Sequence, residues 1–329
     1  MPRTARGCRR DFDLDRVQIV IGEVRRLLWL LRPLYRQEDW QPIGILNQRS
    51  KMSFSFANVN GKAALAAGDD FYDLFRISQG QISDDPMIAI RDLDALHEMA
   101  ARLSEHDSDG LLSEAALGPP VPRPRNSFGI GLNYKDHAAE SKMDLPEIPV
   151  VFSKYPSCIS GPFDEVELRT ERGDYEAELV VVIGRQARDI SEADSWSHVA
   201  GVMVGQDISD RRLQLGARPP QFGLGKSRDT YGPIGPFLVS PDGLEDPDDL
   251  HITCDINGDR RQDARTSSLI FDVSFLVSYL SEVLTLEPGD LIFTGTPAGV
   301  GMPDKRFLVA GDVITTSIEG VGTMTNVCR

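Results

Sequence analysis

The chain has 329 residues, 41% of them hydrophobic and 26% charged, which is typical of a folded protein with a real core. Its formal net charge of −15 argues against nucleic acid as a partner, because contacts with phosphates need a basic surface. Its four cysteines are widely spaced and form no Cys-x-x-Cys pair, which argues against a disulfide framework or a zinc site and favours a cytoplasmic location.

Residues 1–51 differ in charge from the rest of the chain. They contain eleven Lys+Arg and six Asp+Glu and so carry +5, which leaves −20 on residues 52–329. Their apolar patch "LLWLL" is too short to span a membrane, and no signal-peptide cleavage pattern follows it. We therefore expect no membrane partner and interpret residues 1–51 as an extension to the folded core. Met52 would be the natural start or the beginning of the folded part.

The next stretch predicts a small domain. Alternating residues around an Asn-Gly pair in "MSFSFANVNGKAALAAGDDFYDL" predict a hairpin within residues 52–80. Apolar residues at helical spacing predict an amphipathic helix over residues 91–104. The proline-dense "LGPPVPRPRN" at residues 117–126 is the best candidate linker. We therefore predict a small N-terminal domain at residues 52–120 and a larger domain at residues 121–329.

The larger domain reads as mainly β. Short strand-like runs such as "VVFSKY", "ELVVVIG" and "DLIFTG" follow one another, and the clearest helical pattern covers residues 267–284. This pattern favours an α+β fold that is mainly strand over a doubly wound sheet. Two glycine-rich stretches, "GIGLNY" and "TGTPAGVG", lack the residues that a dinucleotide fingerprint or a P-loop requires, so no nucleotide site is expected.

The stretch "GDYEAELVVVIG" places Glu176 and Glu178 at the start of an apolar strand. Alternation puts both side chains on one face, roughly 6.6 Å apart at Cα, where they could converge on one cation. A solvent-facing strand start is the alternative. However, Val180 and Val182 continue the same face, and buried carboxylates are costly without a compensating cation.

A third acid, Asp207, ends the apolar run "VAGVMVGQD", a position where Asp also occurs simply as a turn former. Three carboxylates match the oxygen ligands preferred by Mg²⁺, with Mn²⁺ or Ca²⁺ as substitutes. The stretches around these acids contain no Cys or His, which argues against zinc.

Other polar residues could act on a substrate. In "NYKDHAAES", a helix would place His137 and Glu140 on one face, where the carboxylate would orient the imidazole to take a proton from water. An exposed helical pair is the alternative. Lys226, between glycine-rich segments, could face an oxyanion or be an ordinary loop lysine. Thr294 and Thr296 follow a strand and enter a glycine loop, which suits a carboxylate cradle or a simple tight turn.

The order of these motifs resembles the fumarylacetoacetate hydrolase family, in its acylpyruvate and diketo acid hydrolase-like branch. The motifs are "GLNYKDHAAE", "FSKYPS", "DYEAELVVVIG", "GQDIS", "GKSRDTYGPIGP", "TLEPGDLIFTGTPAGVG" and "GDVITTSIEGVG". The resemblance covers residues 126–329 and, more weakly, the small domain from Met52. It implies the family's mixed β-roll with a small β-rich N-terminal domain, normally as a homodimer.

The resemblance also implies roles for individual residues. They are metal ligands (Glu176, Glu178, Asp207), a water-activating dyad (His137, Glu140), an active-site lysine (Lys226) and substrate-binding residues (Arg211, Gln214, Thr296). The implied metal is Mg²⁺ or Mn²⁺. One departure concerns the sequence after the metal aspartate, where relatives commonly read Ser-Ala-Arg-Asp and this chain has Ser209-Asp210-Arg211-Arg212. The departure bears on substrate preference more than on the metal site.

Residues and resemblance together predict a metal-dependent hydrolase that cleaves a C–C bond in a 1,3-diketo or 2-oxo acid. The ion would polarise the carbonyls, His137 held by Glu140 would activate water, and Lys226 would counter oxyanion charge. Acylpyruvates and diketo-deoxy sugar acids share the required head group. A decarboxylase or an enol–keto isomerase of 2-oxo or 2-hydroxy-dienoic acids on the same site is the alternative, and a non-catalytic oxo-acid-binding protein is a third reading.

Overall fold

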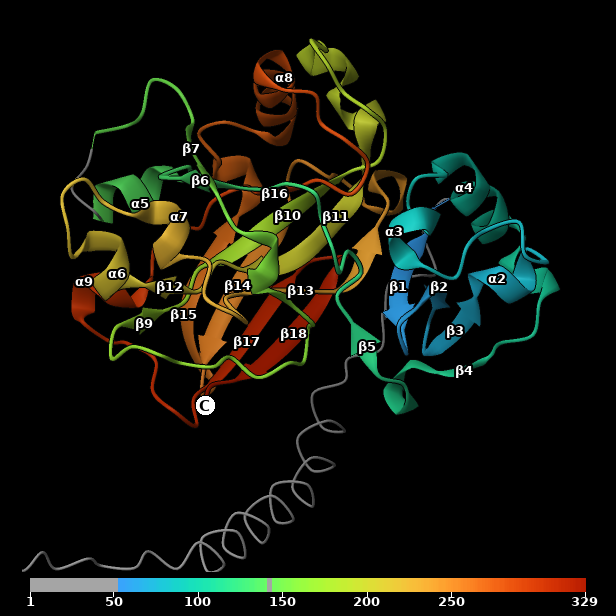
Figure 1. Ribbon diagram of the computed structural model, residues 1–329, viewed down its shortest axis with the longest axis horizontal. Helices are drawn as coiled ribbons and strands as arrows, with labels where there is room; N and C mark the ends of the chain where they lie inside the picture. The colour runs from blue at the N-terminus through green and yellow to red at the C-terminus, as the bar shows by residue number, and fades with distance from the viewer. Residues whose placement is uncertain (1–52, 141–143) are drawn as a thin grey trace, which may run out of the picture. The chain divides into compact units, whose positions relative to one another are not determined.

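The computed structural model describes residues 53–140 and 144–329 (Figure 1). The expectations for residues 1–51 and for Met52 fall on a segment outside the described residues. The described chain consists mainly of strands with several short helices, which confirms the expected α+β, mainly β class.

A twelve-stranded sheet contains most of the strands. Its main path runs in the order β4 (Gly110–Leu111), β3 (Asp70–Asp73), β2 (Lys62–Ala67), β1 (Ser55–Val59), β13 (Gly232–Val239), β11 (Val199–Gln206), β10 (Ala177–Ile183), β16 (Leu291–Phe293), β6 (Ser127–Gly131) and β7 (Val150–Ser153). Two further strands leave this path, β5 (Leu117–Gly118) beside β1 and β8 (Ile159–Ser160) beside β13. Most pairs are antiparallel, but β16 pairs with β6 and β13 with β8 in parallel, so the sheet is mixed.

Two smaller sheets complete the β structure. One joins β9 (Gly173–Asp174) to β12 (Ser209–Asp210). The other has four antiparallel strands in the order β15 (Asp259–Arg265), β14 (His251–Ile256), β17 (Val313–Ile318) and β18 (Gly322–Val327).

The position of strand β10 in the sheet accounts for the apolar run that follows Glu176 and Glu178 in the sequence. Every residue from Ala177 to Ile183 is buried, and the strand is paired on both sides, with β11 and with β16. A strand covered on both faces reads as a continuous apolar run. The polar residues at its start are therefore buried inside the molecule.

The predicted N-terminal hairpin is confirmed as β1 and β2. Asn60 and Gly61 both have positive φ, 54° and 85°, as a two-residue hairpin turn of this kind requires. Strand β1 also pairs with β13, and one hydrophobic cluster includes Phe54 and Leu65 together with Val180 and Phe293. The strands of residues 53–120 thus share a sheet and a core with the later strands. The proposed boundary at residue 120 stays a prediction.

The helices are short and connect or cover the strands. They are α2 (Leu74–Ile77), α3 (Pro86–Ala89), α4 (Leu93–Ala101), α5 (Lys135–Glu140), α6 (Arg211–Leu215), α7 (Phe222–Gly225), α8 (Val273–Val283) and α9 (Gly301–Asp304). Helix α4 matches the predicted amphipathic helix. Helix α8 begins six residues later than expected, because Ile270 and Phe271 donate backbone hydrogen bonds to Asn133 and Asp272 caps the helix.

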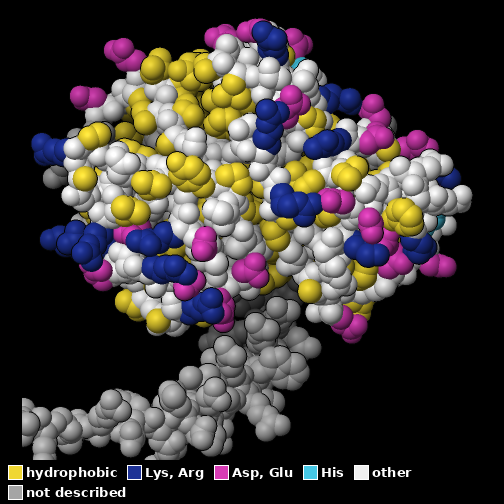
Figure 2. Space-filling model, in the orientation of Figure 1, with side chains coloured by type: hydrophobic (Ala, Val, Ile, Leu, Met, Phe, Trp, Pro, Cys, Tyr) yellow, Lys and Arg dark blue, Asp and Glu magenta, His cyan; other side chains and the backbone are white. Residues whose placement is uncertain are grey.

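Acidic and basic side chains are interspersed on the face drawn in Figure 2. Exposed residues of the described chain form ion pairs, such as Arg265 with Asp249 at 2.6 Å. Exposed pairs of this kind contribute little to stability. Among the described residues, no helix is long and apolar enough to cross a membrane. Within the same residues Cys158, Cys254 and Cys328 are free and buried.

Candidate active site

The three predicted acidic ligands lie together at the ends of two neighbouring strands. Glu176 immediately precedes β10, Glu178 is its second residue, and Asp207 directly follows β11. Because β10 and β11 are antiparallel, the start of one lies beside the end of the other, and the amide of Asp207 donates to the carbonyl of Glu176 at 2.9 Å. One carboxylate oxygen of each residue lies within 4.8 Å of the others, and all three side chains are buried.

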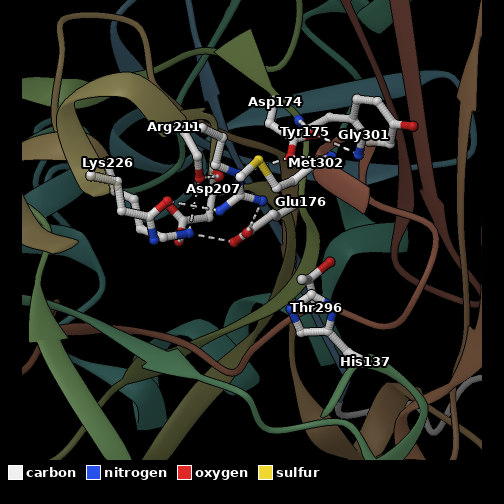
Figure 3. A network of polar contacts seen from close by, with 12 residues as sticks. His137, Asp174, Tyr175, Glu176, Asp207, Arg211, Lys226, Thr296, Gly301 and Met302 are labelled. Carbon is white, nitrogen blue, oxygen red and sulfur yellow. Dashed lines mark hydrogen bonds and ion pairs between the residues drawn. The ribbon is translucent and has the colours of Figure 1, made fainter. Parts of the chain in front are cut away.

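The predicted active-site lysine contacts this acidic group directly. Lys226 follows α7, and its Nζ donates to Oδ2 of Asp207 at 2.7 Å, to Oγ of Ser209 at 2.9 Å, and to Oε2 of Glu176. Figure 3 shows its ammonium group pointing at the two carboxylates. The lysine thus neutralises part of the acidic group in the structure. Its predicted role toward an oxyanion stays a prediction.

Arg211 forms the second cationic contact. Its Nε donates to Oδ2 of Asp174 at 2.8 Å and its Nη2 to Oε1 of Glu176 at 2.6 Å (Figure 3). Its Nη1 donates to Oε1 of Gln214 at 2.9 Å. The guanidinium therefore bridges two acids and orients the predicted substrate glutamine. Substrate binding by Arg211 and Gln214 stays a prediction.

The unusual Asp210-Arg211-Arg212 sequence has a structural explanation. Asp210 caps helix α6 by accepting from the amide of Leu213 at 3.0 Å, and it also pairs with Arg228 at 2.7 Å. Arg212 points toward the surface and pairs with exposed Glu171 at 3.4 Å. The departure from the family pattern thus anchors the helix that carries Arg211, and it leaves the acidic group itself intact.

The two glutamates have opposite pKa shifts. Burial acts against ionisation of Glu176, but Lys226 and then Arg211 outweigh it and lower its pKa to about 2. Burial raises the pKa of Glu178 well above its ordinary value, and the neighbouring charges of Asp207 and Glu176 raise it further. Its carboxylate accepts from the amide of Gly295 at 2.8 Å. Glu178 is therefore the acid whose charge is least compensated.

The predicted dyad forms on helix α5. His137 Nδ1 lies 3.4 Å from Oε2 of Glu140, and Glu140 also accepts from the amide of Gly299 at 3.1 and 3.2 Å. A positive charge on His137 would lower the pKa of Glu176, so the ring lies within electrostatic range of the acidic group. Figure 3 shows Thr296 in the same region, where its hydroxyl accepts from Nε2 of Gln262 at 2.7 Å.

The sequence analysis missed two residues of this network. Lys154, directly after β7, donates to Oδ1 of Asp207 at 2.6 Å, and Asp174 binds Arg211. The sequence contains a pattern that could have pointed to each of them. Asp174 precedes Glu176 by two residues, the same spacing that relates Glu176 to Glu178, and Lys154 is a charged residue at the end of the apolar run "VVFSKY".

The residues fit a hard divalent cation. Four buried carboxyl groups, those of Asp174, Glu176, Glu178 and Asp207, face three buried cations, Lys154, Arg211 and Lys226, so with every group ionised one negative charge is in excess. Buried charge without compensation is costly, and oxygen ligands are those that Mg²⁺ and Mn²⁺ prefer. Glu176, Glu178 and Asp207 would hold the ion.

Residues 126–329 match the family model described as fumarylacetoacetate (FAA) hydrolase C-terminal, so the chain belongs to this family, as its motifs predict. It is 46% identical over 215 residues to 2,4-didehydro-3-deoxy-L-rhamnonate hydrolase of Sphingomonas sp. (strain SKA58), covering 64% of this chain and 75% of that protein. It is 41% identical over 218 residues to oxaloacetate tautomerase FAHD2B, mitochondrial, of Bos taurus, covering 65% and 69%.

A solved structure shares the fold. The crystal structure of maleylpyruvate hydrolase from Sphingobium sp. SYK-6, in complex with manganese (II) ion and pyruvate, superimposes with a TM-score of 0.70 at 29% identity. The match covers 83% of this chain and 98% of that chain. These relatives are enzymes, two hydrolases and a tautomerase, and the manganese complex together with the buried acidic group points to a divalent metal.

Proposed function

We propose that the protein is a divalent-metal-dependent hydrolase that cleaves a C–C bond in a 1,3-diketo or 2-oxo acid. The observation that carries this proposal is a buried group of three acidic side chains close enough to share one cation, near a histidine held by a carboxylate. The hydrolases among the relatives support it.

The charge balance of the site favours an anionic substrate. With four carboxylates and three cations the site carries −1, and a divalent ion changes this to +1. A monoanionic head group, such as the carboxylate of a 2-oxo acid, would then bring the buried site to neutrality. When bound, the metal ion supplies polarisation of the substrate carbonyls.

The chain's own residues supply the proton transfers. With Nδ1 of His137 facing Glu140, a neutral ring would carry its proton on that nitrogen, which leaves Nε2 to accept a proton from water. The resulting hydroxide adds to the remote carbonyl carbon, and the bond between that carbon and the adjacent methylene carbon, on the side of the 2-oxo acid head, breaks. The bonding electrons stay on the leaving fragment as an enolate, and His137 returns its proton to that carbon. Gly299 fixes Glu140 and so fixes the ring.

A second function, enol–keto tautomerisation of a 2-oxo acid, is favoured by the tautomerase relative. Tautomerisation moves one proton between carbon and oxygen and needs no water attack or bond cleavage. Decarboxylation would use the same enolate chemistry. The same acidic group and substrate head would serve all three reactions, so attack by water at His137 separates hydrolysis from the other two.

The test is a panel of acylpyruvates, diketo-deoxy sugar acids and oxaloacetate, followed by ultraviolet absorbance and product analysis with and without Mg²⁺ or Mn²⁺. We expect hydrolysis products from a diketo acid only with metal present. His137→Ala should lower the hydrolysis rate at least about a hundredfold and leave metal affinity nearly unchanged. Glu178→Ala should lose metal binding and activity together.

His251→Ala is the matched control, because His251 also pairs with a carboxylate, Asp263 at 2.8 Å, but on the surface. It should retain full activity. Enol–keto exchange of oxaloacetate without any cleavage product would favour the tautomerase reading. Metal binding without turnover of any compound on the panel would favour a binding protein and contradict the proposal.

A further inference from the structure

Lys154 is a buried lysine beside the acidic group that takes no part in the proposed proton transfers. It follows strand β7, and its side chain is fully buried, with a residue exposure of 1%. Burying an ammonium group is costly unless hydrogen bonds and opposite charge compensate it. The contacts of this group therefore show what it does for the site.

The ammonium group has three N–H donors, and three oxygens accept from it. They are Oδ1 of Asp207 at 2.6 Å, the carbonyl of Lys226 at 2.5 Å and the carbonyl of Tyr231 at 3.2 Å. The centroid of the Phe293 ring lies 5.3 Å from Nζ. A lysine has no further donor to offer, so this group has no hydrogen bond left for a substrate.

These contacts tie together the segments that carry two site residues. Lys154 holds one oxygen of Asp207, while the other oxygen faces Lys226. It also holds the main chain of Lys226 itself. The Tyr231 carbonyl accepts in addition from the amide of Ile208, the residue after Asp207, at 3.1 Å. Lys154 is thus the shared partner of the Asp207 strand end and the Lys226 loop.

We propose that Lys154 is a positioning residue of the metal site, which fixes the carboxylate of Asp207 and the main chain of Lys226 in the orientation that metal binding needs. This inference rests on the proposed metal-dependent function. It predicts the direction in which cation affinity changes when Lys154 is replaced. Removing a nearby positive charge should by electrostatics alone tighten binding of a cation, whereas loss of positioning should weaken it.

The experiment measures Mn²⁺ affinity directly, by calorimetry and by the electron paramagnetic resonance of free Mn²⁺, in the full chain. Lys154→Met keeps the volume of the side chain but removes its charge and donors. We expect it to bind Mn²⁺ about 10- to 100-fold more weakly, the usual effect of losing a partner that orients a metal ligand. Lys154→Ala should show the same loss, and added propylammonium, which replaces the missing atoms, should restore affinity where propanol does not.

Arg261→Met is the matched control, because Arg261 is a largely buried cation that binds Tyr175 and Asp304 and does not contact the three acids. It should bind Mn²⁺ as the unmodified protein does. Unchanged or tighter binding in Lys154→Met would overturn the inference and leave the metal site standing. Absence of Mn²⁺ binding in the unmodified protein would overturn both. If both Lys154 variants are unfolded even with Mn²⁺ and propylammonium present, Lys154 is required for folding, and its assignment to the metal site is overturned.

Discussion

Glu176 and Glu178 are separated by a single alanine, yet they have opposite electrostatic environments. The sequence predicts that the two side chains share a face, because strand alternation is a local rule. It does not predict that Lys226 and Arg211 compensate only one of them. Those partners lie 50 and 35 residues away along the chain, and they reach Glu176 only through the packing of α6 and α7 near β10.

This asymmetry predicts opposite stability effects for two matched substitutions in the metal-free protein. Glu178→Gln removes a carboxyl group whose ionisation the folded state opposes, and it should raise the free energy of unfolding at pH 7 by on the order of 1 kcal/mol. Glu176→Gln leaves Lys226 and Arg211 without their partner and should lower it by about 3 to 5 kcal/mol. Urea unfolding after treatment with a chelator measures both, and destabilisation of similar size in the two variants would contradict the prediction.

The pH dependence has opposite signs for the same two residues. Folding raises the pKa of Glu178, so the folded state favours its protonated form and loses stability from this group as pH rises above its unfolded pKa. Folding lowers the pKa of Glu176 to about 2, so its contribution is full above the unfolded pKa and is lost as pH falls toward 2. The measurement is the free energy of unfolding at several pH values. We expect Glu178→Gln to lack the first pH dependence and Glu176→Gln to lack the second.

Helices and turns that depend on neighbouring residues in the sequence can be predicted correctly, whereas element boundaries that depend on distant residues cannot. The Asn-Gly hairpin and the placement of His137 and Glu140 on one helix face depend on neighbours in sequence, and both are confirmed. The start of α8 was predicted too early, because Asn133 binds the backbone of residues 270 and 271, 137 and 138 residues further along the chain. A helical pattern alone carries no information about such a competing partner.

The glycine loop after β16 positions the dyad, and two glycines provide a matched test. Gly299 has φ of +103° and donates to Glu140, and a Cβ there would lie 1.9 Å from the carbonyl oxygen of Arg261. Gly311 has a similar φ of +95°, but a Cβ there meets no atom within 4 Å. Gly311→Ala should lower the free energy of unfolding by about 1 to 2 kcal/mol, the cost of the left-handed conformation.

Gly299→Ala should cost roughly a further 1 to 3 kcal/mol because the backbone must move away from Arg261. Its larger effect should be on catalysis, since Glu140 loses the amide that holds it. We expect kcat to fall about a hundredfold, with Mn²⁺ affinity unchanged, while Gly311→Ala keeps full activity. Equal activity in the two variants, measured well below their melting temperatures, would show that the loop does not position the dyad.

At the scale of the described molecule, the mainly β class followed from the many short strand-like runs, but their order in the sheet did not. Strand β1 lies beside β13, from which it is separated by well over a hundred residues. Apolar runs show that strands exist and are buried, while the choice of neighbour depends on packing across the whole sheet. The same packing gives residues 53–120 and the later strands one hydrophobic cluster.

A fragment experiment tests the predicted domain boundary. Fragment 121–329 would lack β1 and the core residues Phe54, Phe56 and Leu65, which pack in one cluster with Val180 and Leu238. Exposing that surface should leave the fragment aggregated or without a cooperative unfolding transition, because each buried large apolar side chain contributes about 1.5 to 3 kcal/mol. Fragment 53–329 is the control, and we expect it to unfold cooperatively and retain activity. If fragment 121–329 instead unfolds cooperatively as a soluble protein, residue 120 separates two independently folding domains, and the shared cluster is an interface between them.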